Sequence, residues 1–136
     1  MFNNLVAVFT GKHKARLLKA AGVASVELVC AGDTWRAIHA ECAHRFDTVP
    51  LPGRDAGGEG MDLQPLVLTG PQLALVLTRL FRGARAYSVA HPHERAVYQR
   101  VYDAAAAVLD QVDLNEAEGK PIPPIVIDAR LGSGSA

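Results

Sequence analysis

The sequence contains little cysteine, few aromatic residues and no long hydrophobic segment. Its two cysteines, Cys30 and Cys42, are too few for the disulfide framework of a small secreted domain, which favours a reducing compartment. The longest uncharged apolar runs, LVAVF and QLALVLT, are far shorter than the ~20 residues that a bilayer span requires. The first run also has no positive charge before it, so it does not resemble an export signal. We therefore expect a cytoplasmic protein without a membrane partner.

The remaining composition is that of an ordinary globular domain. Of 136 residues, 49% are hydrophobic and 21% are charged, which excludes a disordered chain and fits one compact domain. We expect this single domain to cover residues 1–131 and to be followed by a flexible tail at 132–136. A long loop at 48–62, rich in glycine and proline, is expected to divide an N-terminal βα half from a more helical C-terminal half.

Hydrophobic periodicity predicts an α+β fold in which three main helices pack on a small sheet of three or four strands. Thr69 and Gln72 form a capping box, in which each side chain bonds the other residue's backbone N–H group. Gly11, Gly22 and Gly83 are expected to end the segments that precede them. The expected strands are 5–9, 23–30, 65–69 and 125–128, and the expected helices are a short one at 12–22 and main ones at 33–46, 70–83 and 92–112.

Charge is unevenly distributed although the net charge is zero. A basic stretch over residues 12–19 has no acid before Glu27, a second basic zone begins at Arg79, and residues 103–118 are acidic. Such asymmetry can steer a charged partner or bring two copies together. Leu75 lies outside the apolar stripe of its helix and could belong to an interface. The candidate interaction residues are Lys12, Lys14, Arg16, Lys19, Leu75, Arg79, Arg82 and Arg85.

Cys30 and Arg36 have the spacing of a cysteine-phosphatase loop, with five residues between them. That chemistry needs a thiolate within a ring of backbone N–H groups at a helix N-terminus, with the arginine binding the phosphate. Over fewer than 20 residues, the apolar strand, Cys30, Gly32 and the following helix resemble the motif of low-molecular-weight phosphatases and arsenate reductases. The resemblance implies a phosphatase-like enzyme with Cys30 as nucleophile. Asp33 departs from this motif because it adds a carboxylate where a dianion would bind.

The histidines and cysteines do not form a recognisable metal motif. The triplet His39-Ala40-Glu41 is typical of zinc deaminases, but these need a downstream Cys-x-x-Cys and no cysteine follows Cys42. His39 and Cys42 share a helix face, whereas His44 projects from the other side. We therefore expect no metal and no cofactor.

With no catalytic constellation other than Cys30 and Arg36, we expect a small intracellular protein that is not an enzyme. It would act through protein–protein interaction or self-assembly, with a protein partner or a second copy of itself. Two alternatives stay open: the phosphatase-like enzyme, and a nucleic-acid-binding accessory protein that uses the basic stretch 12–19.

Overall fold

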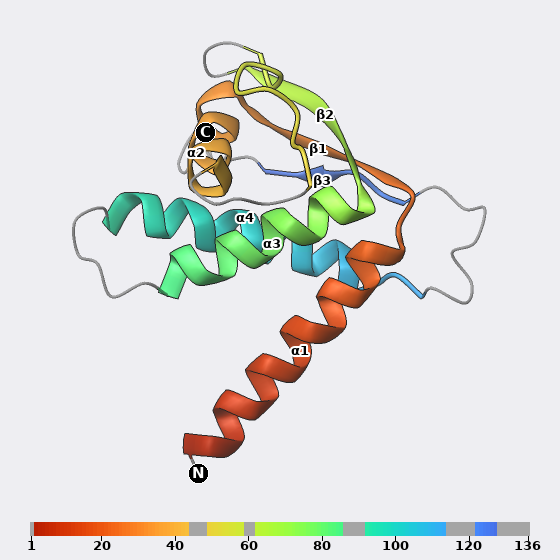
Figure 1. Ribbon diagram of the computed structural model, residues 1–136, viewed down its shortest axis with the longest axis vertical. Coiled ribbons are helices and arrows are strands. Elements are labelled where there is room, and N and C mark those ends of the chain that lie inside the picture. Colours follow the sequence, from red (N-terminus) through yellow and green to blue (C-terminus); the bar gives the residue numbers. More distant parts are fainter. Residues whose placement is uncertain (1, 44–48, 59–61, 86–91, 114–121, 128–136) are drawn as a thin grey trace, which may run out of the picture.

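The computed structural model describes residues 2–43, 49–58, 62–85, 92–113 and 122–127. It confirms the α+β class: four helices and a three-stranded mixed sheet form one compact body (Figure 1). The predicted tail at 132–136 lies outside the described residues. In chain order the elements are α1 (Phe2–Gly22), β1 (Ser25–Ala31), α2 (Gly32–Ala43), β2 (Leu63–Thr69), α3 (Gly70–Arg85), α4 (Pro92–Asp110) and β3 (Ile125–Val126).

The sheet has the strand order β2-β1-β3, so β1 is its central strand. Strand β2 pairs with β1 antiparallel, from Ser25↔Thr69 to Ala31↔Leu63, and β3 pairs with β1 parallel. Because side chains alternate along a strand, the register places Val26, Leu28 and Cys30 on one face, and these three are buried. This face of the sheet forms one side of the hydrophobic core.

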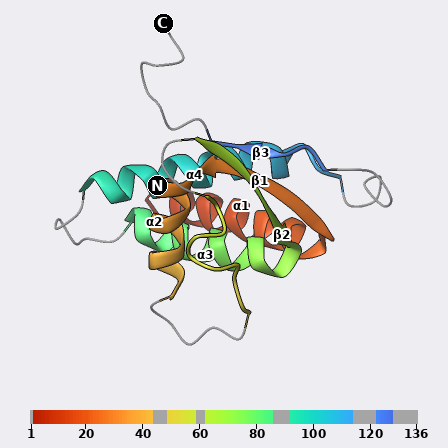
Figure 2. The same ribbon diagram turned by 90° about the horizontal axis from the view of Figure 1, so that it is seen from above.

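All four helices contribute to that same core, so they cover one face of the sheet (Figures 1 and 2). Trp35 and Ile38 of α2 are fully buried, as the helical spacing of the apolar residues predicts. Helices α3 and α4 form the largest part of the core, through Leu73, Val76, Leu77 and Leu80 on α3 and Tyr98, Val101, Tyr102, Ala105 and Leu109 on α4. The stripe on α3 agrees with the predicted one. On α4 the predicted stripe was Val97, Val101, Ala105, Val108 and Val112; Val97 and Val108 are only partly buried, and the flanking Tyr98, Tyr102 and Leu109 face the core instead.

The start of α3 confirms the capping box. The backbone N–H of Thr69 donates to the Gln72 side-chain oxygen at 2.9 Å, and the Gln72 N–H donates to the Thr69 hydroxyl at 3.3 Å. Two amide donors that the first helical turn leaves without partners are thereby satisfied, which explains why β2 passes directly into α3.

Three local predictions are wrong. Residues 5–9 belong to α1 rather than to a strand, because the run is too short for its β-branched content to decide the structure. Gly11 lies inside α1, where an alanine Cβ would meet no atom within 4 Å. Gly83 does not end α3, which continues to Arg85; a Cβ at Gly83 would approach the Tyr98 ring to 2.9 Å, so this glycine serves helix packing.

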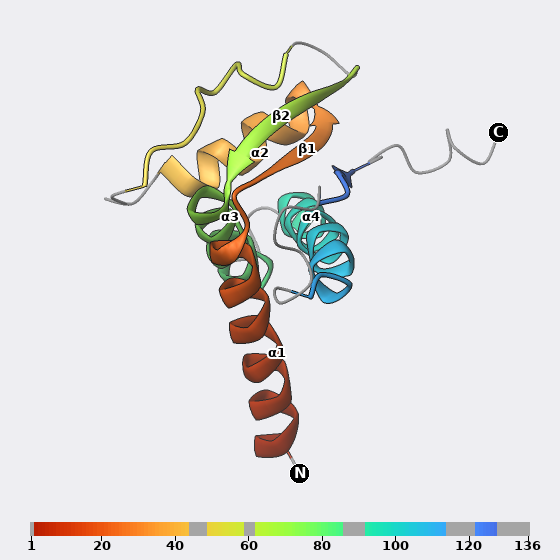
Figure 3. The same ribbon diagram turned by 90° about the vertical axis from the view of Figure 1, so that its right-hand side faces the viewer.

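Helix α1 extends beyond the body of the protein. Figures 1 and 3 show its N-terminal part standing clear of the other elements, whereas its C-terminal part packs on the core. Ala20 is fully buried there and Leu17 packs against the cluster. The C-terminal part of α1 therefore belongs to the core, and its N-terminal part projects from the body.

Candidate functional site

Cys30 is a core residue. Its side chain is fully buried in the hydrophobic cluster, and burial raises the pKa of its thiol from the ordinary value of 9.0 to about 11. A cysteine nucleophile requires the opposite change, because the thiolate is the reactive form. The residues between Cys30 and Arg36 are not a loop around the sulfur: Ala31 ends β1, and α2 begins at Gly32.

Arg36 contacts its own chain at the start of α2. Its guanidinium donates to the Gly58 carbonyl at 3.4 Å and forms an ion pair with Asp33 in the same helix. The Gly58 carbonyl also lies against Gly32, where a Cβ would be only 2.4 Å from its oxygen. A backbone carbonyl is thus an acceptor at the Arg36 guanidinium, to which the phosphatase hypothesis assigns a bound dianion.

The loop between α2 and β2 is held to the body over its described part, residues 49–58. The Trp35 indole N–H donates to the Gly53 carbonyl at 2.8 Å, and the Gln72 amide donates to the Pro50 carbonyl at 2.7 Å. Gly57 packs so closely on Trp35 that a Cβ would approach the tryptophan Cβ to 2.8 Å. The described part of this segment is therefore held against α2 and the start of α3.

The predicted interaction residues lie on α1 and α3 in different environments. Lys12, Lys14, Arg82 and Arg85 are exposed, whereas Arg16, Lys19 and Leu75 are half-buried. Arg79, expected on the surface, is only 8% exposed and so does not form part of an open basic face. The sequence analysis named two basic zones, over residues 12–19 and from Arg79; in the structure their residues are divided between exposed and half-buried or buried positions.

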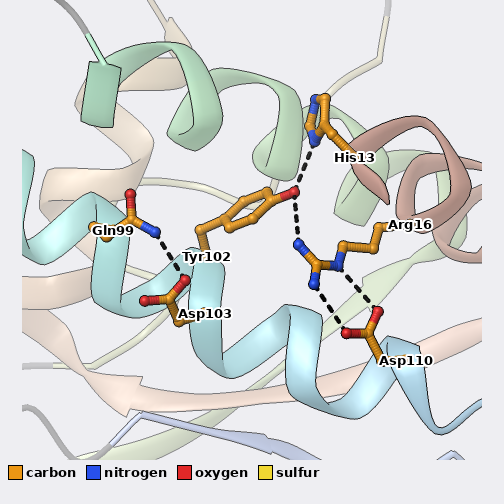
Figure 4. Close-up of polar contacts among 6 residues, drawn as sticks. All are labelled: His13, Arg16, Gln99, Tyr102, Asp103 and Asp110. Atoms are coloured by element: carbon orange, nitrogen blue, oxygen red, sulfur yellow. Dashed lines mark hydrogen bonds and ion pairs between the residues drawn. The ribbon is translucent and has the colours of Figure 1, made fainter. Parts of the chain in front are cut away.

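A polar and aromatic cluster joins α1, α3 and α4, and Figure 4 shows its polar contacts between α1 and α4. Arg16 of α1 donates two hydrogen bonds to the Asp110 carboxylate of α4, at 2.9 and 3.0 Å. Nδ1 of His13 lies 2.8 Å from the Tyr102 hydroxyl, and the His13 ring stacks on Phe81 with ring centroids 3.8 Å apart. The basic stretch thereby meets the acidic end of α4 inside one chain. The pKa of the Asp110 carboxyl is lowered, first by its hydrogen bond with Arg16 and further by the charges of Lys19 and Lys12.

The sheet face opposite the helices carries apolar side chains that no described helix covers. Val67 is 59% exposed, Val126 52% and Leu63 41%. Pro65 on β2 is exposed and Val29 on β1 is half-buried. The register places Val29 opposite both Pro65 and Val126, so these residues form one patch across all three strands. We call this the outer sheet face.

The outer sheet face was missed by the sequence reasoning, although the sequence contains a signal for it. Strand LQPLVLT is apolar at both alternating sets of positions: Leu66 and Leu68 face the core, and Leu63, Pro65 and Val67 face away. A strand that is apolar on both sides is typical of a sheet covered on both faces. Glu27 is the single charged residue among the three strands.

No three histidine, cysteine, aspartate or glutamate side chains among the described residues are grouped closely enough to hold a metal ion. His44, considered as a ligand above, lies outside the described part of the chain. Within that part, no helix has the length and apolar character needed to cross a membrane.

Comparison with known proteins adds no assignment to this geometry. No protein-family model, no curated protein and no solved structure matches the chain. Its function is therefore inferred from its own residues.

Proposed function

We propose that this chain is not an enzyme and that it acts by binding a second protein, either another chain or a second copy of itself, through the outer sheet face. The observation that carries the proposal is the contiguous apolar patch on three adjacent strands, with side chains exposed by 41–59%. Single exposed apolar residues are normal on a protein surface, whereas contiguous ones mark interaction sites.

Two properties of the patch favour a protein partner. It is built on a sheet, so its side chains are held in a fixed arrangement before binding. Glu27 provides a charge within an otherwise uncharged surface, which gives a partner a means of orientation.

Pro65 cannot donate a backbone hydrogen bond, and its place in edge strand β2 disfavours addition of a further strand at that residue. Contact across the face is therefore favoured over extension of the sheet.

The test compares Val67→Lys and Val126→Lys with the matched control Leu18→Lys. Leu18 is 71% exposed but lies on α1, so it supplies an apolar side chain away from the outer sheet face. All three positions are exposed, so the substitutions are expected to leave the free energy of unfolding nearly unchanged. Mass is measured by light scattering over a range of concentrations, and proteins retained from native lysate are identified for each variant.

Self-association above the 14.5 kDa monomer that is lost in both sheet variants and kept in Leu18→Lys would support a second copy as the partner. A monomer that retains one identified protein, with the same dependence on the variants, would support a different chain. A monomer whose retained proteins do not depend on Val67 or Val126 would refute the proposal. The cytoplasmic location and the lack of a cofactor stay predictions from the sequence.

A further inference from the structure

His13 connects three helices through one side chain. It lies on α1, its ring stacks on Phe81 of α3 at 3.8 Å with planes 12° apart, and its Nδ1 is 2.8 Å from the Tyr102 hydroxyl oxygen of α4. The Arg85 guanidinium lies 3.7 Å from the Phe81 ring centre. His13 and Arg85 cannot occupy the same ring face at these distances, so Phe81 lies between them.

The contacts of Tyr102 bear on which nitrogen of His13 carries the imidazole proton. Arg16 Nη1 donates to the Tyr102 oxygen at 3.5 Å, and a guanidinium group can only donate. Tyr102 keeps its own hydrogen to donate, and Nδ1 of His13 lies 2.8 Å from its oxygen, the contact that Figure 4 marks. We assign a neutral His13 ring with its proton on Nε2, so that Nδ1 accepts the Tyr102 hydrogen.

Among the described residues, three arginines act electrostatically on His13: Arg16 on α1, and Arg82 and Arg85 on α3. Helix α4 contributes the Tyr102 hydroxyl at 2.8 Å, and its Asp110 carboxylate is bound by Arg16. Burial lowers the pKa of His13 below its ordinary value of 6.5, and Arg85, Arg16 and Arg82 lower it further. A protonated ring would place another positive charge among these guanidinium groups and could no longer accept from Tyr102.

We propose that His13 is an acid-sensitive contact that holds α1 against α3 and α4 when its ring is neutral and loosens α1 when the ring is protonated. The direction follows from linkage. Because the packed state lowers the pKa of His13, that state binds the proton less well than the loosened one. The contribution of His13 to packing is therefore complete above pH 6.5 and is lost as the pH falls through 6.5 towards the lower value of the packed state.

The experiment measures hydrogen exchange of α1 amides over residues 12–20 between pH 7.5 and 5.0, corrected for the intrinsic pH dependence of exchange. For one proton, we expect α1 protection to fall by at most about tenfold per pH unit below 6.5, while β1 stays protected. His13→Gln can accept from Tyr102 but cannot be protonated there, so its α1 protection should not depend on pH. His39→Gln on α2 is the matched control and should keep the wild-type dependence.

An NMR titration of the His13 ring measures the midpoint of its protonation in the wild-type protein and so tests the proposal without any variant. A midpoint below 6.5 that coincides with the loss of α1 protection would support the proposal. A midpoint at or above 6.5, constant α1 protection in the wild type, or an unchanged dependence in His13→Gln would overturn it. Because the amide protection of α1 and the association through the outer sheet face are measured separately, either proposal can fail without the other.

Discussion

The reactivity of Cys30 separates the interaction protein from the phosphatase-like enzyme. With a thiol pKa of about 11, Cys30 at pH 7.5 is ionised to ~0.03%, whereas a thiol with the ordinary value of 9.0 is ionised to ~3%. The raised pKa alone therefore predicts alkylation about 100-fold slower than in the unfolded chain. Burial adds to this, since the fully buried sulfur must first become accessible through an opening of the structure.

The assay is a time course with iodoacetamide at pH 7.5, in buffer and in denaturing urea, with each site quantified by peptide mass spectrometry. Cys42, 3% exposed, provides an internal control for a buried thiol in the same digest. We expect Cys30 to react at least about 100-fold more slowly in the native protein, and the rate to rise with urea as opening becomes easier.

A Cys30 that reacts faster in the native protein than in urea would refute this reasoning. It would show that the folded state stabilises the thiolate, and the enzyme hypothesis would return with Arg36 as the phosphate-binding group. The variant Arg36→Ala makes the distinction sharper. If Arg36 only binds Asp33 and the Gly58 carbonyl, its removal leaves Cys30 slow or makes it faster by freeing the loop; if Arg36 stabilises a thiolate, its removal makes Cys30 slower.

Two further predictions test the packing and the remaining alternative. Gly11→Ala should raise the free energy of unfolding by up to about 1 kcal/mol, because alanine favours a helix and its Cβ has no neighbour within 4 Å. Gly83→Ala should lower it by about 1–3 kcal/mol, because its Cβ would come 2.9 Å from the Tyr98 ring and 3.1 Å from the Glu41 carboxylate; urea unfolding of both variants checks the opposite signs. For nucleic acid, fluorescence anisotropy with a 20-mer at about 150 mM salt should show no binding that depends on Lys12 and Lys14, because the nearby Asp110 carboxylate reduces the positive potential of α1. Tight, steeply salt-dependent binding that is lost in Lys12→Ala/Lys14→Ala would favour the nucleic-acid alternative instead.

Local pattern was sufficient where a segment carried both a period and a terminal signal. The α3 prediction combined an apolar stripe with the Thr69–Gln72 capping box, and both are present in the structure. Prediction from local pattern failed where the contact that decides the structure comes from a distant part of the chain. The Tyr98 side chain, on another helix, explains why a glycine occurs at position 83, and sequence neighbours cannot show that contact.

The candidate sites show the same contrast between local sequence pattern and contacts from distant segments. The spacing of Cys30 and Arg36 is a local property, but the burial of the thiol depends on how β1 lies over the helices. Likewise, the basic stretch 12–19 looked available for a partner because Asp110 is 94 residues from Arg16 in the sequence. Only the packing of α1 against α4 shows that part of this charge is used within the fold.

These internal contacts are the reason that the proposed function is placed on the outer sheet face rather than on the helical side. On the helical side, Arg16 is paired with Asp110, Arg85 lies over Phe81, and the described part of the α2–β2 loop is hydrogen-bonded to Trp35 and Gln72. Leu18 is exposed on α1, as single surface leucines commonly are. On the sheet side, the strand register joins the exposed apolar residues into one surface, and burying them would remove apolar area from water at about 25 cal/mol per Å². Under the proposed function, burial of this surface would supply the apolar part of the binding free energy, which is why the sheet variants, rather than variants of the basic residues, are the decisive test.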